Sequence, residues 1–390
     1  AAGFRPAYAD IMDPDFELPK DMKMSIGIDW ELGDGYFFSA DYLKTETDKD
    51  LHFKQLRLGN PAFAGSVNCP AIGNTVSNMP IGTAVDGRQI YADYSYCGKA
   101  MEKFYDSRGY DMLLTNTDKG HSELVSLSMA KTWDNWDVYA SYTWQDVQSV
   151  GNLSSSRNIS NFKYTTKYAD FNEDVLHRSI YSREHTFNFV ANYTKYFFSD
   201  HPTIFTFVGA AISGEPFSYT FGNYKDGALW GLDKESTRDA TAAFYVPNGD
   251  VVVPSYFQSD LDSYIAAAGL SGYAGGFAPI NGFETDWNYR LDFKLTQEFP
   301  GLGLTDKDKF VLTLDVENLL NLIDSEYGRQ TKASAYDRSI SEAVPVSLGD
   351  GNFTYQYKPA YKMSLAKIHN ESTNYYRSLY RIQLGFKYMF

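Results

Sequence analysis

Residues 380–390 read YRIQLGFKYMF and alternate between apolar and polar side chains. Successive side chains of a β-strand point to opposite faces, so the stretch predicts a strand with one apolar face and one polar face. The apolar face carries Tyr380, Ile382, Leu384, Phe386, Tyr388 and Phe390, and the other face carries Arg381, Gln383, Gly385 and Lys387.

The composition of the 390-residue chain fits many strands of this kind. Aromatic residues make up 16%, with 31 Tyr and 27 Phe, yet the mean hydropathy of -0.39 is that of a soluble protein. A membrane barrel combines both properties, because lipid-facing and lumen-facing residues alternate and their average cancels. No stretch approaches the roughly 18 apolar residues of a spanning helix, which excludes a helical membrane protein. We therefore predict an all-β, antiparallel transmembrane β-barrel, located in the outer membrane of a Gram-negative bacterium.

The final strand has a further expected role. An aromatic-rich, alternating strand that ends on phenylalanine is typical of outer-membrane barrels, whose closing strand carries the insertion signal. We expect Phe386, Tyr388 and Phe390 to form this signal and the barrel-assembly machinery to bind it. The other end, AAGFRPAYAD, has no basic and apolar signal-peptide regions, and we interpret it as an internal cut or a processed end.

Nine segments with period-2 alternation predict nine spanning strands, at about 22–30, 36–42, 125–129, 136–144, 187–193, 204–212, 287–295, 310–316 and 380–390. Their connections alternate in length. The links at 32–35, 133–136, 199–202 and 300–309 are short, and those at about 46–120, 150–183, 222–285 and 321–375 are long. Outer-membrane barrels have short periplasmic turns and long extracellular loops, which predicts the orientation.

The strand number is odd, whereas bacterial single-chain barrels have even numbers. An open sheet would also leave backbone groups unpaired in lipid, at several kcal/mol each. We therefore expect residues 1–390 to be the C-terminal part of a larger barrel. Two more alternating runs, 51–58 and 355–365, are interpreted as hairpin extensions above the membrane, with spanning strands as the alternative.

Six motifs, in order, resemble the C-terminal part of TonB-dependent receptors, most closely the Oar-like branch. They are LLTNTDKGHSELVSLSMAKTW (113–133) with the following YASYTW, REHTFNFVANY (183–193), ISGEPFSYTFG (212–222), WNYRLDFKLTQEFP (287–300), FVLTLDVENLLNLIDSEYG (310–328) and the final YRIQLGFKYMF.

The resemblance implies a 22-stranded barrel closed by an N-terminal plug and energised by the TonB complex, to which this chain would supply about strands 14 to 22. The plug and the TonB box are absent from these residues. Glycan-importing relatives are the nearest competing subclass.

The formal net charge of -14 and the lack of a basic run argue against a nucleic-acid partner. Cys69 and Cys97 lie in one polar region that contains glycine and proline. In an oxidising envelope they would close a loop as a disulfide; two unrelated buried thiols are the alternative.

We find no catalytic motif and expect neither an enzyme nor a cofactor. Tyr256, Tyr264, Tyr273 and Phe277 are interleaved with glycines and are candidates for either ligand contact or loop self-packing. Three acidic clusters lack the EF-hand pattern, and we interpret them as solvated charge rather than as a Ca²⁺ site. They are Asp10/Asp13/Asp15, Asp48/Asp50 and Asp260/Asp262.

The predicted function is that of a receptor or transporter, which binds an external cargo through its long loops. Two alternatives remain open. One is a complete 12-stranded porin or autotransporter-like barrel, and the other is an outer-membrane enzyme that uses Ser255, Asp260 and His185.

Overall fold

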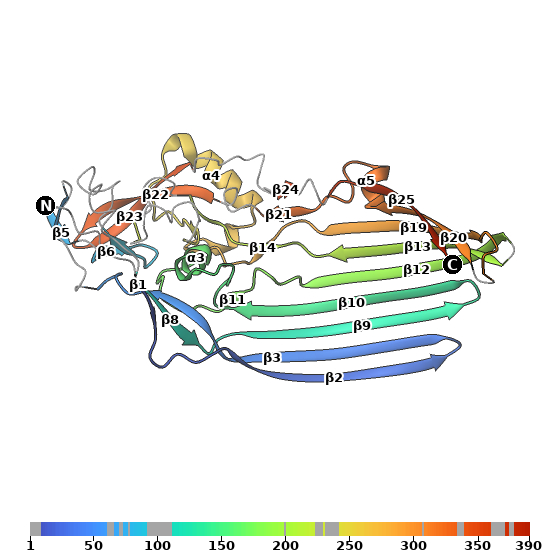
Figure 1. Cartoon of the computed structure of the whole chain (residues 1–390). Coiled ribbons are helices and arrows are strands. Elements are labelled where there is room, and N and C mark those ends of the chain that lie inside the picture. The colour runs from blue at the N-terminus through green and yellow to red at the C-terminus, as the bar shows by residue number, and fades with distance from the viewer. Residues whose placement is uncertain are drawn as a thin grey trace, which may run out of the picture.

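The computed structural model describes residues 9–60, 66–69, 73–76, 79–91, 111–198, 200–222, 229–230, 242–305, 308–333, 339–359, 371–373 and 378–390. One large, mostly antiparallel sheet dominates it, and a second body of short strands and helices lies at one end of that sheet (Figure 1). We call this second body the loop-end unit.

Each of the nine strands predicted from the sequence is present in the large sheet. They are β2 (Lys20–Gly33), β3 (Tyr36–Gln55), β9 (His121–Trp133), β10 (Trp136–Ser149), β12 (His185–Phe198), β13 (His201–Ile212), β19 (Asn288–Pro300), β20 (Lys309–Glu317) and β25 (Arg381–Met389). They pair antiparallel in chain order from β2 to β25. In the described part of the chain, β2 and β25 are the two end strands of this series, and each pairs with one other strand of it.

The four short links lie together at the end of the sheet opposite the loop-end unit, and the C-terminus lies at that same end (Figure 1). The β2–β3 turn is Asp34-Gly35, with φ of 48° and 76°. Positive φ at both central residues is the geometry of a two-residue turn whose twist matches that of the strands it joins. The short links thus lie at one end of the sheet and the long links lead to the other, whereas the assignment of these ends to the two sides of a membrane stays a prediction.

The strands are staggered in a regular way. A row of paired residues across the sheet shows the stagger. The row starts at Tyr36, directly after the β2–β3 turn, and passes through Lys131, Val138, Ala191, Phe207, Phe293 and Val316 to Ile382. In β25 this row lies seven residues before the end of the strand at Met389. The turn end thus shifts by about one residue per strand. With a rise of about 3.3 Å per residue and a strand spacing of about 4.8 Å, the strands tilt about 35° from the normal to the plane of the turns.

The loop-end unit is built from the long links. Its strands and helices are β4 (Ser66–Cys69), β5 (Gly73–Val76), β6 (Pro80–Ala84), β7 (Gln89–Tyr91), α3 (Asn158–Tyr164), β14 (Pro216–Phe217), β15 (Thr220–Phe221), β16 (Tyr245–Val246), α4 (Ser255–Ala267), a 3₁₀ turn (Ser271–Tyr273), β17 (Gly276–Phe277), β18 (Phe283–Glu284), β22 (Ser339–Gly349) and β23 (Asn352–Pro359). Three short strands at its border pair with the large sheet, namely β1 (Ala9–Met12), β8 (Asp111–Thr117) and β11 (His177–Arg178). The last long link also carries α5 (Leu319–Ile323), which lies against β19, and β21 (Thr331–Ala333), which pairs with β24 (Glu371–Thr373).

The two extra alternating runs fall in this unit or at its border. Residues 51–55 continue β3 beyond the point where β2 stops pairing, and they pair with β8 in the same register that β3 keeps with β9. Residues 355–359 lie in β23, within a separate five-stranded sheet of order β15-β22-β23-β6-β7. Residues 360–365 of the second run lie outside the described residues. The described parts agree with extensions beyond the nine strands.

Candidate functional site

One face of the large sheet is apolar, and most of its side chains are exposed or half-buried. Paired rows keep the apolar residues of neighbouring strands on the same face, for example Ile28–Ala40–Leu127 and Leu314–Leu384. The exposed fraction is 70% for Ile26 and 72% for Leu384. Scattered apolar surface is normal in soluble proteins, but a contiguous face across nine strands marks an interaction surface.

Two rows of aromatic rings bound this apolar face. The turn-end row contains Trp133, Trp136, Tyr193 and Phe205, whose neighbouring ring centroids are 6.3, 4.7 and 6.2 Å apart. Phe310, Tyr388 and Phe390 extend the aromatic surface on β20 and β25, with centroids 4.8 and 6.0 Å apart.

The loop-end row lies nearer the long links. It contains Tyr142, His185 and Trp287, whose rings stack at 6.1 and 6.0 Å, together with Phe187 and Tyr289. Beyond this row the same face becomes charged, since Lys44 Nζ lies 2.7 Å from Glu46 and 3.6 Å from Glu123. The apolar surface is therefore a band with two aromatic borders.

The height of the band can be estimated along β10, which carries Trp136 at one border and Trp144 at the other. Eight residues at about 3.4 Å each span about 27 Å along the strand, or about 22 Å along the normal at a tilt near 35°. The apolar band of outer-membrane barrels is about 25 Å tall. The two lengths agree within the precision of the estimate.

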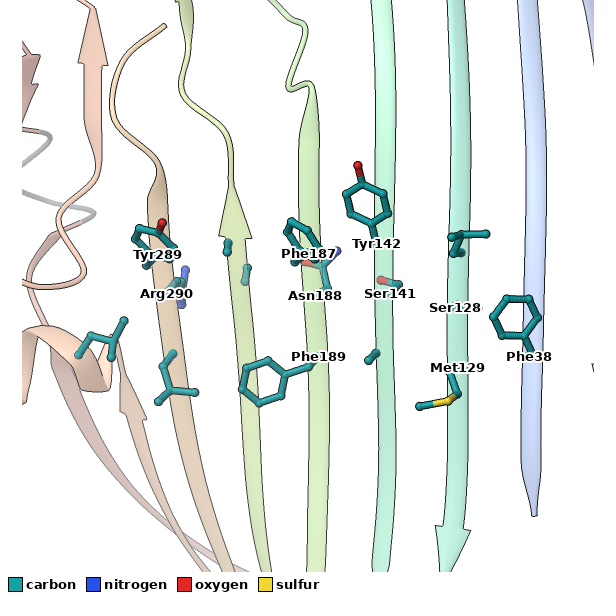
Figure 2. Close-up of a pocket in the computed structure, with 16 residues that line it drawn as sticks. Phe38, Ser128, Met129, Ser141, Tyr142, Phe187, Asn188, Phe189, Tyr289 and Arg290 are labelled. Atoms are coloured by element: carbon teal, nitrogen blue, oxygen red, sulfur yellow. The ribbon is translucent and has the colours of Figure 1, made fainter. Parts of the chain in front are cut away.

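A hollow of about 590 Å³ lies on this band. Figure 2 shows the residues that line it. Large side chains surround it, such as Phe38, Met129, Phe187, Phe189 and Tyr289, and small residues such as Ala140 and Ala211 leave the space between them. Leu320 of α5 also lines the hollow. The hollow is part of the apolar surface and carries no polar cluster of its own.

The opposite face of the sheet is polar. On β19, β20 and β25 its charges form cross-strand pairs: Lys294 Nζ lies 3.1 Å from Asp315, Lys309 Nζ lies 2.7 Å from Glu298, and Arg381 lies 3.9 Å from Glu317. Elsewhere it carries hydroxyl and amide side chains, such as Ser126 and Thr143, whose oxygens are 3.2 Å apart. This face suits contact with water or with a polar protein surface.

The loop-end unit has a dense core of its own, centred on a buried ion pair. Arg88 is fully buried, and its Nη1 donates to Asp86 Oδ2 at 2.9 Å. Its Nε donates to the carbonyl of Tyr168 at 2.9 Å and its Nη2 to the carbonyl of Ala243 at 2.5 Å. The guanidinium also lies over the rings of Phe277, Trp230 and Phe221, at 4.7, 5.0 and 5.5 Å.

The carboxylate of Asp86 is held as firmly as the guanidinium. Tyr355 Oη donates to Asp86 Oδ1 at 2.8 Å and accepts from Trp230 Nε1 at 3.1 Å. Burial, with the nearby Asp86 charge, raises the pKa of Tyr355 well above its ordinary value, so this phenol stays protonated and donates. These contacts join segments from all four long links, since residues 86–88, 168, 221–243 and 355 each come from a different one.

Buried titratable groups occur elsewhere in the unit. Burial lowers the pKa of Lys167 to about 8, and its Nζ lies 5.5 Å from the centre of the Phe162 ring. Burial also lowers the pKa of His177, whose ring nitrogens lie 2.9 and 3.1 Å from the carbonyls of Arg178 and Val150. His177 is therefore a buried structural histidine, and sequence analysis gave no sign of its burial.

The four aromatic candidates for ligand contact fall into two groups. Tyr264 is buried in the core, with its ring edge-on to Tyr219 at 6.2 Å, and Phe277 packs on Arg88 and on Tyr168. For these two residues the structure agrees with loop self-packing. Tyr256 and Tyr273 are exposed.

A cavity of about 380 Å³ lies in the same long link, between α4 and the segments 246–253 and 271–274. Its lining is Val246, Pro247, Gly249, Val251, Val253, Gln258, Asp262, Ile265, Ser271 and Ala274. The sequence analysis singled out this link but none of these lining residues, apart from Asp262 as half of an acidic pair. The helical spacing of Phe257, Leu261 and Tyr264, the buried face of α4, is a signal that would have located the helix.

The remaining candidates are separated or explained locally. Ser255 and Asp260 lie on α4, whereas His185 begins β12 and its Nδ1 lies 2.9 Å from Tyr142 Oη. Among the described residues, no hydrogen bond or ion pair joins the three. Asp13 accepts hydrogen bonds from Asp15 N and Thr115 Oγ1 at 3.1 and 2.7 Å.

Within the described residues, no three His, Cys, Asp or Glu side chains gather as a metal site, and no helix there is long and apolar enough to cross a membrane. Cys97 lies outside the described residues, so the Cys69–Cys97 disulfide stays a prediction. Comparison with family models and with curated proteins found no match to this chain.

Proposed function

We propose that this chain is the C-terminal barrel portion of an outer-membrane TonB-dependent receptor or transporter of the Oar-like branch, which binds an external cargo through its long loops and moves it through a plugged lumen. The observation that carries the membrane part of this proposal is the exposed apolar band across nine strands, bounded by two aromatic rows. In water such a face would aggregate; in lipid it is satisfied.

The geometry of the sheet supports a barrel rather than a flat assembly. A tilt of about 35° lies at the lower end of the 35–45° range of outer-membrane barrels. The edges of β2 and β25 need partners in lipid, because unpaired backbone groups cost several kcal/mol each there. In the proposal, the remaining strands of the barrel pair with these edges and the N-terminal plug contacts the polar face.

The receptor assignment rests on the six motifs and on the arrangement of the long links. The placement of residues 51–55 in an extension of β3 and of 355–359 in β23 favours the count of nine over a complete 12-stranded barrel. The TonB complex would act through the N-terminal region of the receptor, the barrel-assembly machinery on Phe386, Tyr388 and Phe390, and lipid on the apolar band. No enzymatic activity is proposed.

The six tryptophans provide a test of the membrane part. Trp30, Trp133, Trp136, Trp144 and Trp287 belong to the sheet surface and its borders, whereas Trp230 is buried in the loop-end unit. Single-tryptophan variants of the full-length protein, with phenylalanine in place of every other tryptophan, should be reconstituted in vesicles of brominated phosphatidylcholine.

We expect strong quenching of the sheet tryptophans by the brominated acyl chains and almost none of Trp230, the matched control. If Trp30 and Trp136 are quenched by aqueous acrylamide and no more than Trp230 by the lipid, the apolar band does not face a membrane and the proposal fails.

A further inference from the structure

The cavity beside α4 has an apolar floor and a polar rim. Val246 is buried, and Val251, Val253 and Ile265 are half-buried against the core of the loop-end unit. Gln258, Asp262 and Ser271 are exposed at the rim. Ligand pockets of 300–1,000 Å³ commonly combine apolar walls with a few polar groups that fix orientation, and this cavity of about 380 Å³ falls in that range.

The walls of the cavity are held in place independently of any ligand. Helix α4 (Figure 1) is anchored by Phe257, Leu261 and Tyr264 on its buried face, and the cavity lies beside the adjacent helical face of Gln258, Asp262 and Ile265. The opposite wall is tied down by hydrogen bonds from Gly275 N to Val246 O and from Val252 N to Tyr355 O, both 2.8 Å.

The polar rim offers one fixed negative charge. Gln258 Nε2 donates to Asp262 Oδ1 at 2.8 Å, one helical turn apart, which orients the carboxylate. No other hydrogen bond or ion pair to Asp262 is found among the described residues, so its second oxygen remains free to accept.

The surrounding chain reinforces that charge. Residues 242–287 contain five carboxylates and no Lys, Arg or His. Asp250 is engaged by Tyr245 Oη, and Glu284 is engaged by Arg178. The charged side chains of this stretch are therefore all negative, which favours a cation over an anion at the rim.

We infer that this cavity binds a small amphiphilic cation, in which an aliphatic group occupies the valine and isoleucine floor and a protonated amine pairs with Asp262. The amino terminus of a peptide that begins with an aliphatic residue has this chemistry. No aromatic ring lines the cavity, which disfavours a sugar that would need a stacking surface. The inference rests on the proposed function, since it places the first contact with cargo in a long extracellular link.

The test uses isoleucyl-isoleucinamide, which carries a free amino terminus and no carboxylate, as the probe. Binding to the full-length protein in lipid nanodiscs is measured by equilibrium dialysis. N-acetyl-isoleucyl-isoleucinamide, which lacks the positive charge, is the control ligand, and we expect it to bind at least tenfold more weakly because a hydrogen bond to a charged group is lost.

Two matched variants separate the site from general acidity. Asp262→Asn should weaken probe binding at least tenfold, whereas Asp260→Asn, on the same helix but outside the cavity lining, should change it less than twofold. Ala274→Trp, which fills the cavity from its rim, should abolish binding.

The inference is overturned if the probe shows no saturable binding, if the acetylated ligand binds equally well, if the two asparagine variants behave alike, or if Ala274→Trp binds normally. Quenching by brominated lipid is independent of these variants. Normal quenching without probe binding would refute only the proposed binding site. Probe binding without quenching would refute only the proposed membrane barrel.

Discussion

The sheet and the loop-end unit treat apolar side chains in opposite ways. In the sheet, Leu384 and Ile26 are largely exposed, whereas in the loop-end unit Leu229, Ile340 and Phe244 are fully buried. The loop-end unit solves the usual problem of a protein in water and even encloses a fully paired ion pair. The sheet leaves its apolar face uncovered but regular. The contrast indicates that the two regions are designed for different solvents.

The largest effect is expected at the buried ion pair. Arg88→Met leaves the Asp86 carboxylate buried without its partner, which typically costs about 3–5 kcal/mol. Unfolding in urea, followed by the fluorescence of Trp230 as the only tryptophan, should shift to lower urea, while a single Trp136 reports an unchanged sheet. The double variant Arg88→Met/Asp86→Leu should recover most of the loss. Equal losses in both reporters would mean that the two regions unfold as one body.

A second prediction compares the two faces of the last strand, β25. Leu384→Arg places a charge on the apolar face, and Gln383→Arg places the same charge on the polar face. Near mid-membrane the first should cost about 2–4 kcal/mol and reduce the amount of assembled protein in outer membranes, and the second should cost little. Leu384 is 72% exposed, so in a soluble protein both variants would be tolerated. Equal tolerance of both variants would contradict the conclusion that the apolar face of the sheet contacts lipid.

The nine strands could be predicted because their information is local. Period-2 alternation is set by the pleat of each strand and does not depend on distant residues. Strand ends were less well placed: the segment 36–42 is only the first part of β3, which continues to Gln55. There β8 pairs with β3 in the register that β9 keeps with it, so the ladder on the β9 side simply continues. The run of polar residues 44–50 interrupts the apolar alternation, so this continuation leaves no periodic signal.

The loop-end unit could not be predicted for the same physical reason. Arg88, Trp230 and Tyr355 come from three different long links and meet only in the folded chain. No sequence spacing connects them. Tyr264 was singled out because of its glycine-rich surroundings, but its burial follows from the helix that carries it. Of the candidate binding cavity, only the general region was foreseen.

A third prediction concerns Lys167. Its pKa is about 8 in the folded protein and 10.5 without burial, so below pH 8 the folded state must hold a charge that burial disfavours. Stability from this group therefore rises as the pH increases from 8 to 10.5. Lys167→Met should stabilise the loop-end unit by up to about 3 kcal/mol at pH 7 and by about 1 kcal/mol at pH 10.

Urea unfolding of the single-Trp230 protein at the two pH values measures this difference. Lys119→Met, at an exposed lysine paired with Asp174, is the control and should show no such trend. A gain at Lys167 that does not depend on pH would indicate better apolar packing rather than removal of a buried charge.

The smallest effect is expected on the polar face of the sheet, and it distinguishes a wet surface from a covered one. Lys294 Nζ and Asp315 Oδ1 are 3.1 Å apart, with 47% and 31% of their side chains exposed. An exposed pair of this kind contributes at most about 1 kcal/mol, because water screens it. A double-mutant cycle with Lys294→Met and Asp315→Leu should give a coupling energy below that value, and added salt should reduce it further. A plug packed against this face would remove the water, and breaking the pair would then cost several kcal/mol, as at Arg88.

The double-mutant cycle is therefore measured in the full-length receptor and in a plug-deleted form, and it reports whether the polar face is lined by solvent or by protein. A weak coupling that does not change with the plug places the pair in an open, water-filled lumen, and a strong coupling only with the plug present places Lys294 and Asp315 in its contact surface.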